Sequence, residues 1–257
     1  MHAAPRPRRT AVAAALLTAA ALLGATACGS SPADSPKPAD APKPAGPFGE
    51  LTGSQIVDKA FAATKGAKSL TVDIDLSASA DPVKGYLALD DRGTCAGTLT
   101  MGAADTAELV KADDKNVYLR FDEAFLRKQV KDEDPETQEA TLDALRGRWM
   151  KSPLTDPDNK DMLALCDLKE LLSDFETGAS GIVKGAETTV GGQRALALTE
   201  PGEGGEKSTV YVATQGTPYV LRIVTKGGDE PGTITFSKYG KPVAAKAPAA
   251  KDVVDTD

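Results

Sequence analysis

The segment Leu-Thr-Val-Asp-Ile-Asp-Leu-Ser at residues 70–77 decides the fold class of this 257-residue chain. Apolar and polar side chains alternate along it without a break, with Leu70, Val72, Ile74 and Leu76 on one side. Successive side chains of a β-strand point to opposite faces of the sheet, so this alternation predicts a long strand with one buried and one hydrated face. We therefore expect a sheet that carries the core on one side only.

Strand patterns recur after this segment and are separated by turn residues. They cover residues 84–89, 97–101, 107–111, 116–121, 182–190, 193–199, 208–213, 219–225 and 233–238. The pairs Gly191-Gly192, Gln215-Gly216 and Gly227-Gly228 lie at hairpin distances among the later strands. Because neighbouring strands are not separated by crossover helices, the sheet is expected to be antiparallel.

Helical patterns precede the first strand and interrupt the strand series in the middle. Thr52 and Gln55 have the spacing of a capping box, and residues 56–65 carry one apolar face. Helix is also favoured in a central group, at residues 122–131, 135–145 and 161–175. This order predicts an α+β domain: a strongly curved antiparallel sheet, or half-barrel, with helices packed on the concave face.

Residues 1–27 have the parts of an export signal. The first nine residues carry three arginines and no acid, and an apolar run follows over residues 10–24. This run is shorter than the about 20 residues that a membrane-spanning helix needs. The pattern predicts a cleaved signal peptide. The adjacent Arg8 and Arg9 leave both the general and the twin-arginine export routes open.

Small residues, Ala25-Thr26-Ala27, lead directly into Cys28 at the end of this signal. The arrangement resembles a bacterial lipobox, which implies diacylglyceryl transfer to the Cys28 thiol, cleavage before it and acylation of the new amine. Two or three acyl chains such as palmitate would anchor the protein stably to the extracytoplasmic face of the cell membrane. The alternative is an ordinary signal peptide cut after Ala27, which leaves a soluble secreted protein.

The mature chain divides into a tether, one domain and a tail. Residues 28–52 hold six prolines among small and polar residues, which predicts a solvated, semi-extended tether. Residues 53–242 suffice for one domain with a full hydrophobic core. Residues 243–257 mix Ala, Lys, Pro and Asp and predict a disordered tail.

Charge and histidine content exclude several classes of function. Loss of residues 1–27 removes three arginines and no acid, so the formal charge changes from -7 to -10. Such a surface repels phosphate backbones, which excludes nucleic acid as a partner. The single histidine, His2, lies in the signal, so the mature chain lacks the commonest general base and metal ligand.

Searches for catalytic and metal motifs lead to the same expectation. The chain contains no Ser-x-x-Lys and no Gly-x-Ser-x-Gly pattern. Residues 156–161 resemble a calcium loop faintly, but Lys160 occupies a position that needs an oxygen ligand. We therefore expect a protein that is not an enzyme and has neither a cofactor nor a metal.

Cys95 and Cys166 are the two cysteines besides Cys28. An exported chain with two such cysteines is typical of one internal disulfide. Closing so long a loop restricts the unfolded chain by about 4 kcal/mol in the entropy model. The alternatives are a pair of buried free thiols or a reactive thiol.

The whole layout resembles the actinobacterial LppX/LprA/LprF/LprG lipoprotein family, whose fold is akin to the lipoprotein carriers LolA and LolB. The resemblance rests on the lipobox, the proline-rich tether and the helix at residues 56–65 that leads into Ser69-Leu70-Thr71-Val72. Asn116-Val117-Tyr118-Leu119 and the stretch Arg148-Trp149-Met150-Lys151-Ser152-Pro153 add to it.

This resemblance implies a half-open barrel around an apolar cavity that binds acyl chains of lipids or glycolipids and helps transport them within the cell envelope. Strand alternation gives the candidate ligand-binding residues, which are Ile74, Leu76, Val117, Leu119, Phe121, Leu198, Leu221 and Ile223. The same alternation is equally typical of plain core packing. The alternative function is a non-catalytic envelope interaction or sensor module that binds a protein partner and no lipid.

Overall fold

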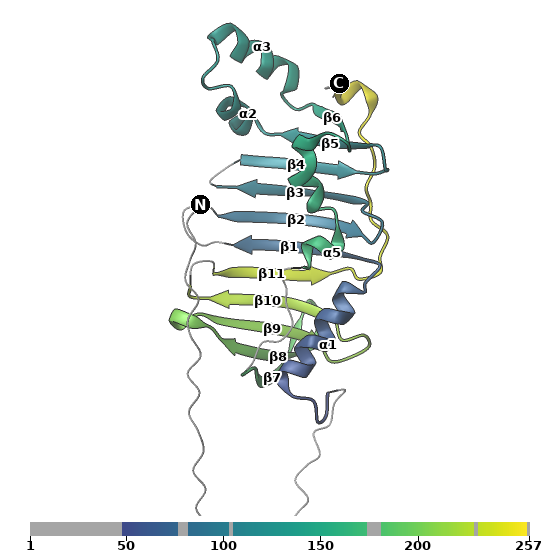
Figure 1. Ribbon diagram of the computed structural model, residues 1–257, viewed down its shortest axis with the longest axis vertical. Coiled ribbons are helices and arrows are strands. Elements are labelled where there is room, and N and C mark those ends of the chain that lie inside the picture. Colours follow the sequence, from purple (N-terminus) through teal and green to yellow (C-terminus); the bar gives the residue numbers. More distant parts are fainter. Residues whose placement is uncertain (1–47, 77–81, 103–104, 174–180, 229–230, 256–257) are drawn as a thin grey trace, which may run out of the picture. The chain divides into compact units, whose positions relative to one another are not determined.

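The computed structural model describes residues 48–76, 82–102, 105–173, 181–228 and 231–255, all within one compact unit, Pro42–Asp257 (Figure 1). The export signal, Cys28 and most of the predicted tether lie outside the described residues. The expectations for those segments are therefore not addressed by the fold.

The described strands form a single open sheet. They are β1 Ser69–Leu76, β2 Val83–Asp90, β3 Cys95–Met101, β4 Asp105–Lys111, β5 Asn116–Phe121, β6 Trp149–Pro153, β7 Val183–Val190, β8 Gln193–Pro201, β9 Lys207–Ala213, β10 Val220–Lys226, β11 Gly232–Ser237 and β12 Val253–Asp255. Their order is β12-β6-β5-β4-β3-β2-β1-β11-β10-β9-β8-β7. The strand that decided the fold class, β1, lies in the middle and pairs with β2 and β11.

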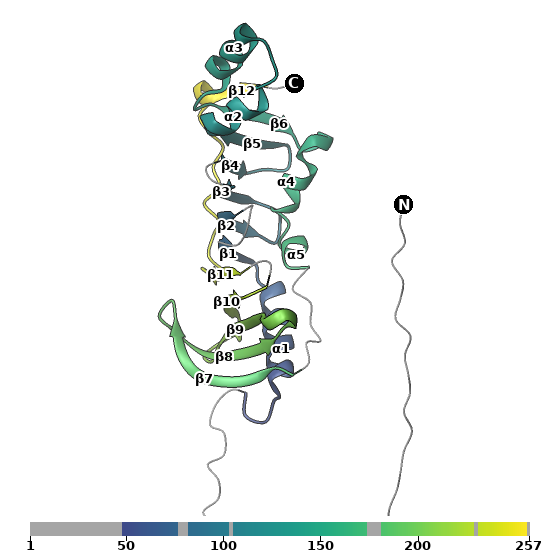
Figure 2. The same cartoon turned by 90° about the vertical axis from the view of Figure 1, so that its left-hand side faces the viewer.

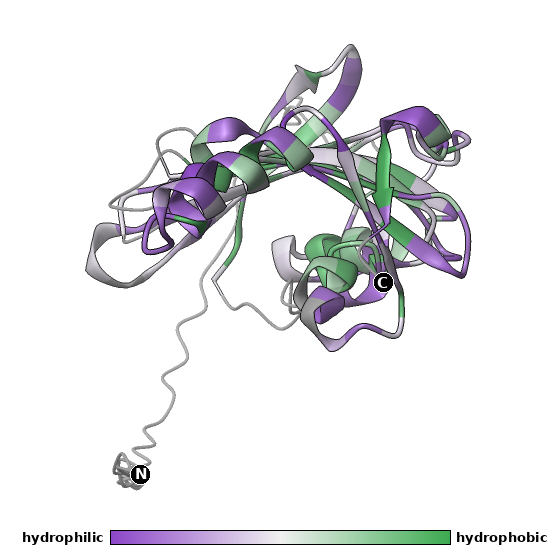
Figure 3. Ribbon diagram, turned by 90° about the horizontal axis from the view of Figure 1, so that it is seen from above, coloured by the Kyte–Doolittle hydropathy of each residue, from purple (hydrophilic) through white to green (hydrophobic). Residues whose placement is uncertain are grey.

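Pairing is antiparallel throughout the described sheet, except that β12 runs parallel to β6. The sheet is curved, with helices α1 (Gly53–Lys65), α4 (Lys160–Ala164) and α5 (Leu168–Leu171) on its concave side (Figure 2). Seen along the stack of strands, apolar helical segments lie inside the curve (Figure 3). These observations confirm the predicted α+β half-barrel.

Two other helices do not cover the concave face. Helix α2 (Glu123–Gln129) packs against β4, and α3 (Pro135–Leu145) packs against α2. Each buries one side chain, Leu126 in α2 and Leu142 in α3. This helical pair therefore adds little cover to the sheet.

Helix α1 is fixed at both ends by contacts that its sequence encodes. The Thr52 hydroxyl accepts a hydrogen bond from the Gln55 backbone N–H at 3.2 Å, and the Gln55 side-chain oxygen accepts one from the Thr52 N–H at 2.8 Å. This is the predicted capping box. Near the other end, the buried Thr64 hydroxyl accepts from the Val220 N–H at 3.0 Å, which ties α1 to β10.

The predicted helix at residues 161–175 is interrupted in the structure. Helix α4 ends before Cys166, and the Asp167 side chain then accepts hydrogen bonds from the Lys169 and Glu170 N–H groups to start α5. A side-chain cap of this kind competes with continuation of a helix, which explains the break. Strand β6, in the segment around Trp149, was not predicted as a strand.

The C-terminal segment corrects the prediction of a disordered tail at residues 243–257, of which the structure describes residues 243–255. Strand β12 pairs with β6 after a short 3-10 turn at Ala250–Asp252. The Arg148 guanidinium donates to the Val253 carbonyl at 3.0 Å, and Lys151 pairs with Asp255 at 2.9 Å. The edge of β6 provides the backbone hydrogen-bond partners that order this segment. The composition of the segment alone does not predict this pairing. We call residues 241–255 the strap.

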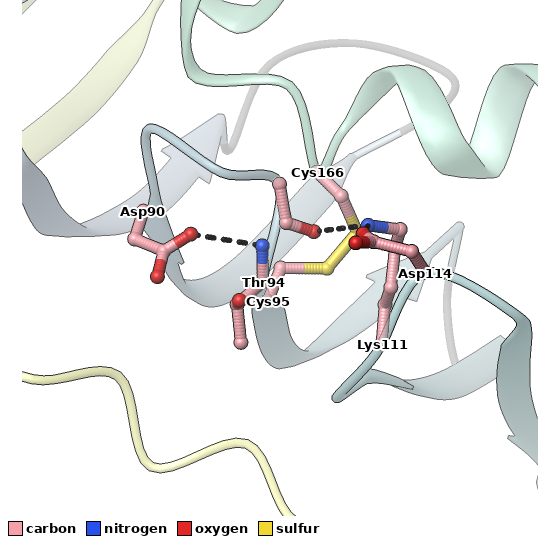
Figure 4. The surroundings of a disulfide bond; sticks show 7 residues. Asp90, Thr94, Cys95, Lys111, Asp114 and Cys166 are labelled. Carbon is pink, nitrogen blue, oxygen red and sulfur yellow. Dashed lines mark hydrogen bonds and ion pairs between the residues drawn. A yellow bond between two sulfur atoms is a disulfide. The ribbon is translucent and has the colours of Figure 1, made fainter.

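The predicted disulfide is present and joins the helices to the sheet (Figure 4). Cys95 begins β3 and Cys166 lies between α4 and α5, with 5.4 Å between the two Cα atoms. Both cysteines are almost fully buried. Beside them, the half-buried Lys111 donates to the Gly93 carbonyl at 2.8 Å. The short helices α4 and α5 are thus held to the concave face by a covalent bond.

Replacing both cysteines with alanine, as Cys95→Ala with Cys166→Ala, should lower the free energy of unfolding by about 4 kcal/mol, because the bond spans 71 residues. Guanidinium unfolding of the oxidised protein measures this change. Wild-type protein with a reducing agent is the matched comparison and should lose a similar amount. An unfolding midpoint that does not move on reduction would contradict the assignment.

Candidate functional site

A continuous row of directly paired side chains crosses the concave face. Ile74 lies opposite Ile234, which lies opposite Ile223, and the row continues through Val210 to Leu198. Directly paired residues project from the same face of a sheet. The row therefore joins five strands, from β1 to β8, by apolar side chains alone.

The same row extends across the other half of the sheet. Ile74 also lies opposite Gly85, and the pairing continues through Leu99 and Ala107 to Phe121. We call the whole row the apolar strip; its members are Leu198, Val210, Ile223, Ile234, Ile74, Gly85, Leu99, Ala107 and Phe121. At about 4.8 Å between neighbouring strands, it is roughly 38 Å long.

Gly85 is the one position in the apolar strip without a side chain. A Cβ atom built there would lie 2.6 Å from Leu99 Cδ2, so the Leu99 side chain occupies the space above Gly85. The strip thus stays apolar where it crosses β2.

The apolar strip differs in burial from the neighbouring row of the same face. Val72, Leu87 and Leu109, one row away, are 2%, 3% and 1% exposed. In the strip, Ile74, Ile234 and most other members are only partly buried. The helices therefore pack over the neighbouring row. Water reaches the apolar face along the strip, except at Leu198, Ala107 and Ile223, which are 1%, 1% and 9% exposed.

The eight predicted ligand-binding residues separate into four groups in this structure. Ile74, Phe121, Leu198 and Ile223 belong to the apolar strip, and of these Leu198 and Ile223 are also buried in the main core cluster. Val117 and Leu119 are buried in that cluster outside the strip. Leu221 belongs to a second, smaller cluster, and Leu76 ends β1 outside both clusters.

A β-bulge explains why Leu221, a predicted ligand-binding residue, does not lie in the apolar strip. The register between β9 and β10 shifts between Val220 and Arg222, so Leu221 is an extra residue in its strand. Val220 and Ile223 remain in the main core cluster, whereas Leu221 packs with Val190, Ala195 and Ala213 in the second cluster.

The backbone groups of Val220 at this bulge are satisfied by side chains. Its N–H donates to Thr64, and its carbonyl accepts from the Tyr239 hydroxyl at 2.5 Å. Burial raises the pKa of Tyr239 well above its ordinary value. The bulge is therefore held by neutral hydrogen bonds in a buried setting.

Five members of the apolar strip were missed by sequence analysis: Val210, Ile234, Gly85, Leu99 and Ala107. Each lies in a predicted strand, but alternation within one strand does not say which residue of the next strand lies opposite. The pairing register supplies that information, and it depends on turn lengths and on the bulge at Leu221.

Five cavities of about 310–410 Å³ occur on the described residues. None of the five is bounded by both the apolar strip and a helix. The cavity beside the disulfide, about 370 Å³, is bordered by charged residues including Lys65, Asp90 and Arg92. There, burial raises the pKa of Asp90, but hydrogen bonds from Arg92 and Thr94 outweigh it, and the net shift is downward.

The described residues contain neither a cluster suited to a metal ion nor a helix that could span a membrane. No group of three or more histidine, cysteine or acidic residues suited to a metal occurs among them. In the segment that resembled a calcium loop, Asp156 accepts a hydrogen bond from Ser152 at 2.9 Å. None of the described helices is long and apolar enough to cross a membrane.

Comparison with known proteins gives matches among solved structures alone. No family model and no curated protein matches the chain. Similar structures include LprF from Mycobacterium bovis, at 13% identity and a TM-score of 0.46, covering 77% of this chain and 97% of that one. LppX from Mycobacterium tuberculosis has 16% identity and a TM-score of 0.47, covering 76% and 98%. This chain resembles LprF and LppX.

A more distant match is the Pseudomonas aeruginosa MucA/MucB complex, at 13% identity and a TM-score of 0.30, covering 77% of this chain and 59% of that one. LprF and LppX are members of the lipoprotein family that the sequence resembles.

Two leucine substitutions test the difference in burial between the rows. Leu109→Ala should lower the free energy of unfolding by about 3 kcal/mol, because it empties a fully packed site. Leu99→Ala, in the apolar strip, should cost less than half as much, since its side chain is already partly in water. Urea denaturation of both variants measures this. Equal losses would mean that the strip is packed as tightly as the layer under the helices.

Proposed function

We propose that this protein is an envelope lipoprotein that binds the acyl chains of a lipid or glycolipid along the apolar strip and helps move them within the cell envelope. The observation that carries the proposal is the continuous row of apolar residues across nine strands, and six of these residues are only partly buried. A contiguous apolar surface of this kind marks a binding site in soluble domains.

The length of the apolar strip suits acyl chains. One leaflet of a bilayer is about 15 Å of hydrocarbon, half of the roughly 30 Å core. The strip, at roughly 38 Å, can therefore accept two such chains end to end or one much longer chain. Each methylene removed from water contributes about 0.8 kcal/mol, so a chain of ordinary length gains enough to offset the loss of its freedom.

In this proposal, lipidation at Cys28 and the proline-rich tether determine where in the envelope the protein is held. The anchor would hold the protein at the extracytoplasmic face of the membrane, where lipids are available. In a polyproline-like conformation, residues 29–47 would reach about 60 Å at roughly 3.1 Å per residue. The domain can then approach the headgroups or stand clear of them.

The proposed role is non-catalytic and needs no cofactor. The mature chain carries no histidine, and no nucleophile motif was found in its sequence. An apolar strip offers shape and surface area to a ligand, with no group placed to transfer a proton. Specificity would therefore come from chain length and branching.

A second candidate function is supported by the dense packing between the helices and the sheet. Ile56 and Ala60 of α1 and Leu172 after α5 are completely buried in the same cluster as the sheet residues. An interaction module that contacts another envelope protein requires such a filled core. In that case the apolar strip would be covered by the partner protein.

Lipid analysis of the purified full chain tests the proposal. We expect solvent extraction of protein from its own host, purified under gentle conditions, to release noncovalent lipid. Ile234→Asn should reduce that lipid roughly tenfold, because a buried amide without a partner costs about 1–3 kcal/mol.

Thr235→Asn is the matched control for this experiment, since Thr235 is the next residue of β11 and projects from the other face. It should keep the lipid at the wild-type level. An empty wild-type protein, or equal losses in the two variants, would contradict acyl binding on the apolar strip and favour the interaction module.

The anchor is tested separately. Cys28→Ala should prevent acylation and move the exported protein from the membrane fraction to the soluble fraction. Fractionation with immunodetection and the intact mass of the mature amino terminus measure both effects. A wild-type protein with an unmodified amino terminus after Ala27 would show that the ordinary signal-peptide alternative holds.

A further inference from the structure

We propose that the convex face carries a second binding site, under the strap, for a small organic anion with a flat apolar body. This site lies on the opposite side of the sheet from the apolar strip and goes beyond the proposed acyl-binding function. It is a cavity of about 340 Å³ between the strap and strands β1–β4. That volume lies within the range of small-molecule sites.

The floor of this cavity is made of small side chains in direct register. Thr71 lies opposite Ala88, Ala88 opposite Ala96, and Ala96 opposite Val110. Large side chains at these positions would fill the space below the strap. Thr71 is only 2% exposed although it projects from the convex face, so the strap covers it.

The strap forms the roof and is fixed at both ends. The Ser69 hydroxyl donates to the Lys241 carbonyl at 2.6 Å, and the β12–β6 pairing holds the far end. Pro242, Val243 and Ala244 border the cavity between these two points. The strap runs along the sheet on the side away from α4 and α5 (Figure 2).

Two aromatic rings border the cavity. Trp149 carries the Arg120 guanidinium over its ring, 4.7 Å from the centroid. Arg120 also forms a two-pronged ion pair with Glu108, with distances of 2.7–3.1 Å. The Glu108 carboxylate beside the cavity is therefore neutralised. Tyr86 is the second ring.

Two ammonium groups give this cavity a positive charge. Lys238 and Lys241 border it, and the Lys238 nitrogen lies 5.6 Å from the centre of the Tyr86 ring. The mature chain carries a formal charge of -10, so a cavity bordered by two lysines differs in charge from most of the surface. The apolar floor and the two aromatic rings suit a flat apolar body, and the two lysines suit a negative charge. Together these features favour an aromatic carboxylate or a ligand of similar chemistry.

The backbone at Lys238 supports a functional role for its side chain. Lys238 has a φ of +52° and is the one non-glycine residue with positive φ in the described part of the chain. Glycine adopts this conformation without cost, whereas a lysine is strained there. A strained residue that directs a charge toward a cavity is typical of binding sites.

The single tryptophan of the chain makes the site directly observable. We would titrate the full chain with 4-nitrobenzoate and follow the Trp149 indole N–H signal by NMR. The expected result is a saturable shift in the millimolar range or below. The neutral 4-nitrobenzamide should bind at least about tenfold more weakly, since it lacks the charge.

Lysine variants separate a built site from general surface attraction. Lys238→Gly should leave the protein at least as stable, because it removes the backbone strain, and Lys241→Ala should leave it folded. Together they should weaken 4-nitrobenzoate binding at least about tenfold. Lys246→Ala, a strap lysine that does not border the cavity, is the control and should bind as wild type does.

Absence of a saturable shift, equal affinity for the acid and the amide, or equal effects of Lys246→Ala and the double variant would each overturn the proposal. None of these outcomes affects the acyl-binding function, because lipid content is measured separately and the apolar strip lies on the other face. Conversely, a lipid-free wild-type protein leaves the test of this cavity unchanged.

Discussion

Pairing between β1 and β11 is the interaction on which the rest of this structure depends. It joins a sheet half built from residues 69–153 to one built from residues 183–237, and five directly opposed residue pairs form the seam. Because the pair Ile74 and Ile234 falls at this seam, the apolar rows of the two halves meet in register. A shift of one residue would turn one half of the apolar surface toward water.

The continuous apolar face is larger than the helices that cover it. Helices α4 and α5 have five and four residues, and the disulfide holds them over one row of the sheet. The apolar strip, one row away, remains partly in contact with water. The stability of the fold depends on the part of the concave face that the helices cover. The proposed ligand binding depends on the part of the same face that they leave uncovered.

Much of this arrangement could be predicted from the sequence because its signals are local. Alternation at residues 70–76 gave the central strand and its faces, the capping box gave the start of α1, and export context gave the Cys95–Cys166 bond. The bounds of β5 and α3 were predicted without error. The strand and the capping box are determined by residues that are close together in the sequence. The disulfide could be predicted because only two cysteines besides Cys28 are present.

What could not be predicted depends on long-range register. The bulge at Leu221 places two residues of one strand against one of its neighbour, and no feature of residues 219–225 marks it. Likewise, Val253-Val254 is too short a pattern to predict a strand. Strand β12 forms because the edge of β6 offers its backbone groups for pairing. Half of the predicted ligand-binding residues therefore lie in the apolar strip, and the others lie elsewhere for reasons of pairing.

The parallel attachment of β12 also bears on self-association. Strand β12 covers the backbone donors and acceptors along the edge of β6. Detachment of β12 by proteolysis would present that row to other chains. The short strand is in this sense a guard against edge-to-edge pairing between copies of the domain.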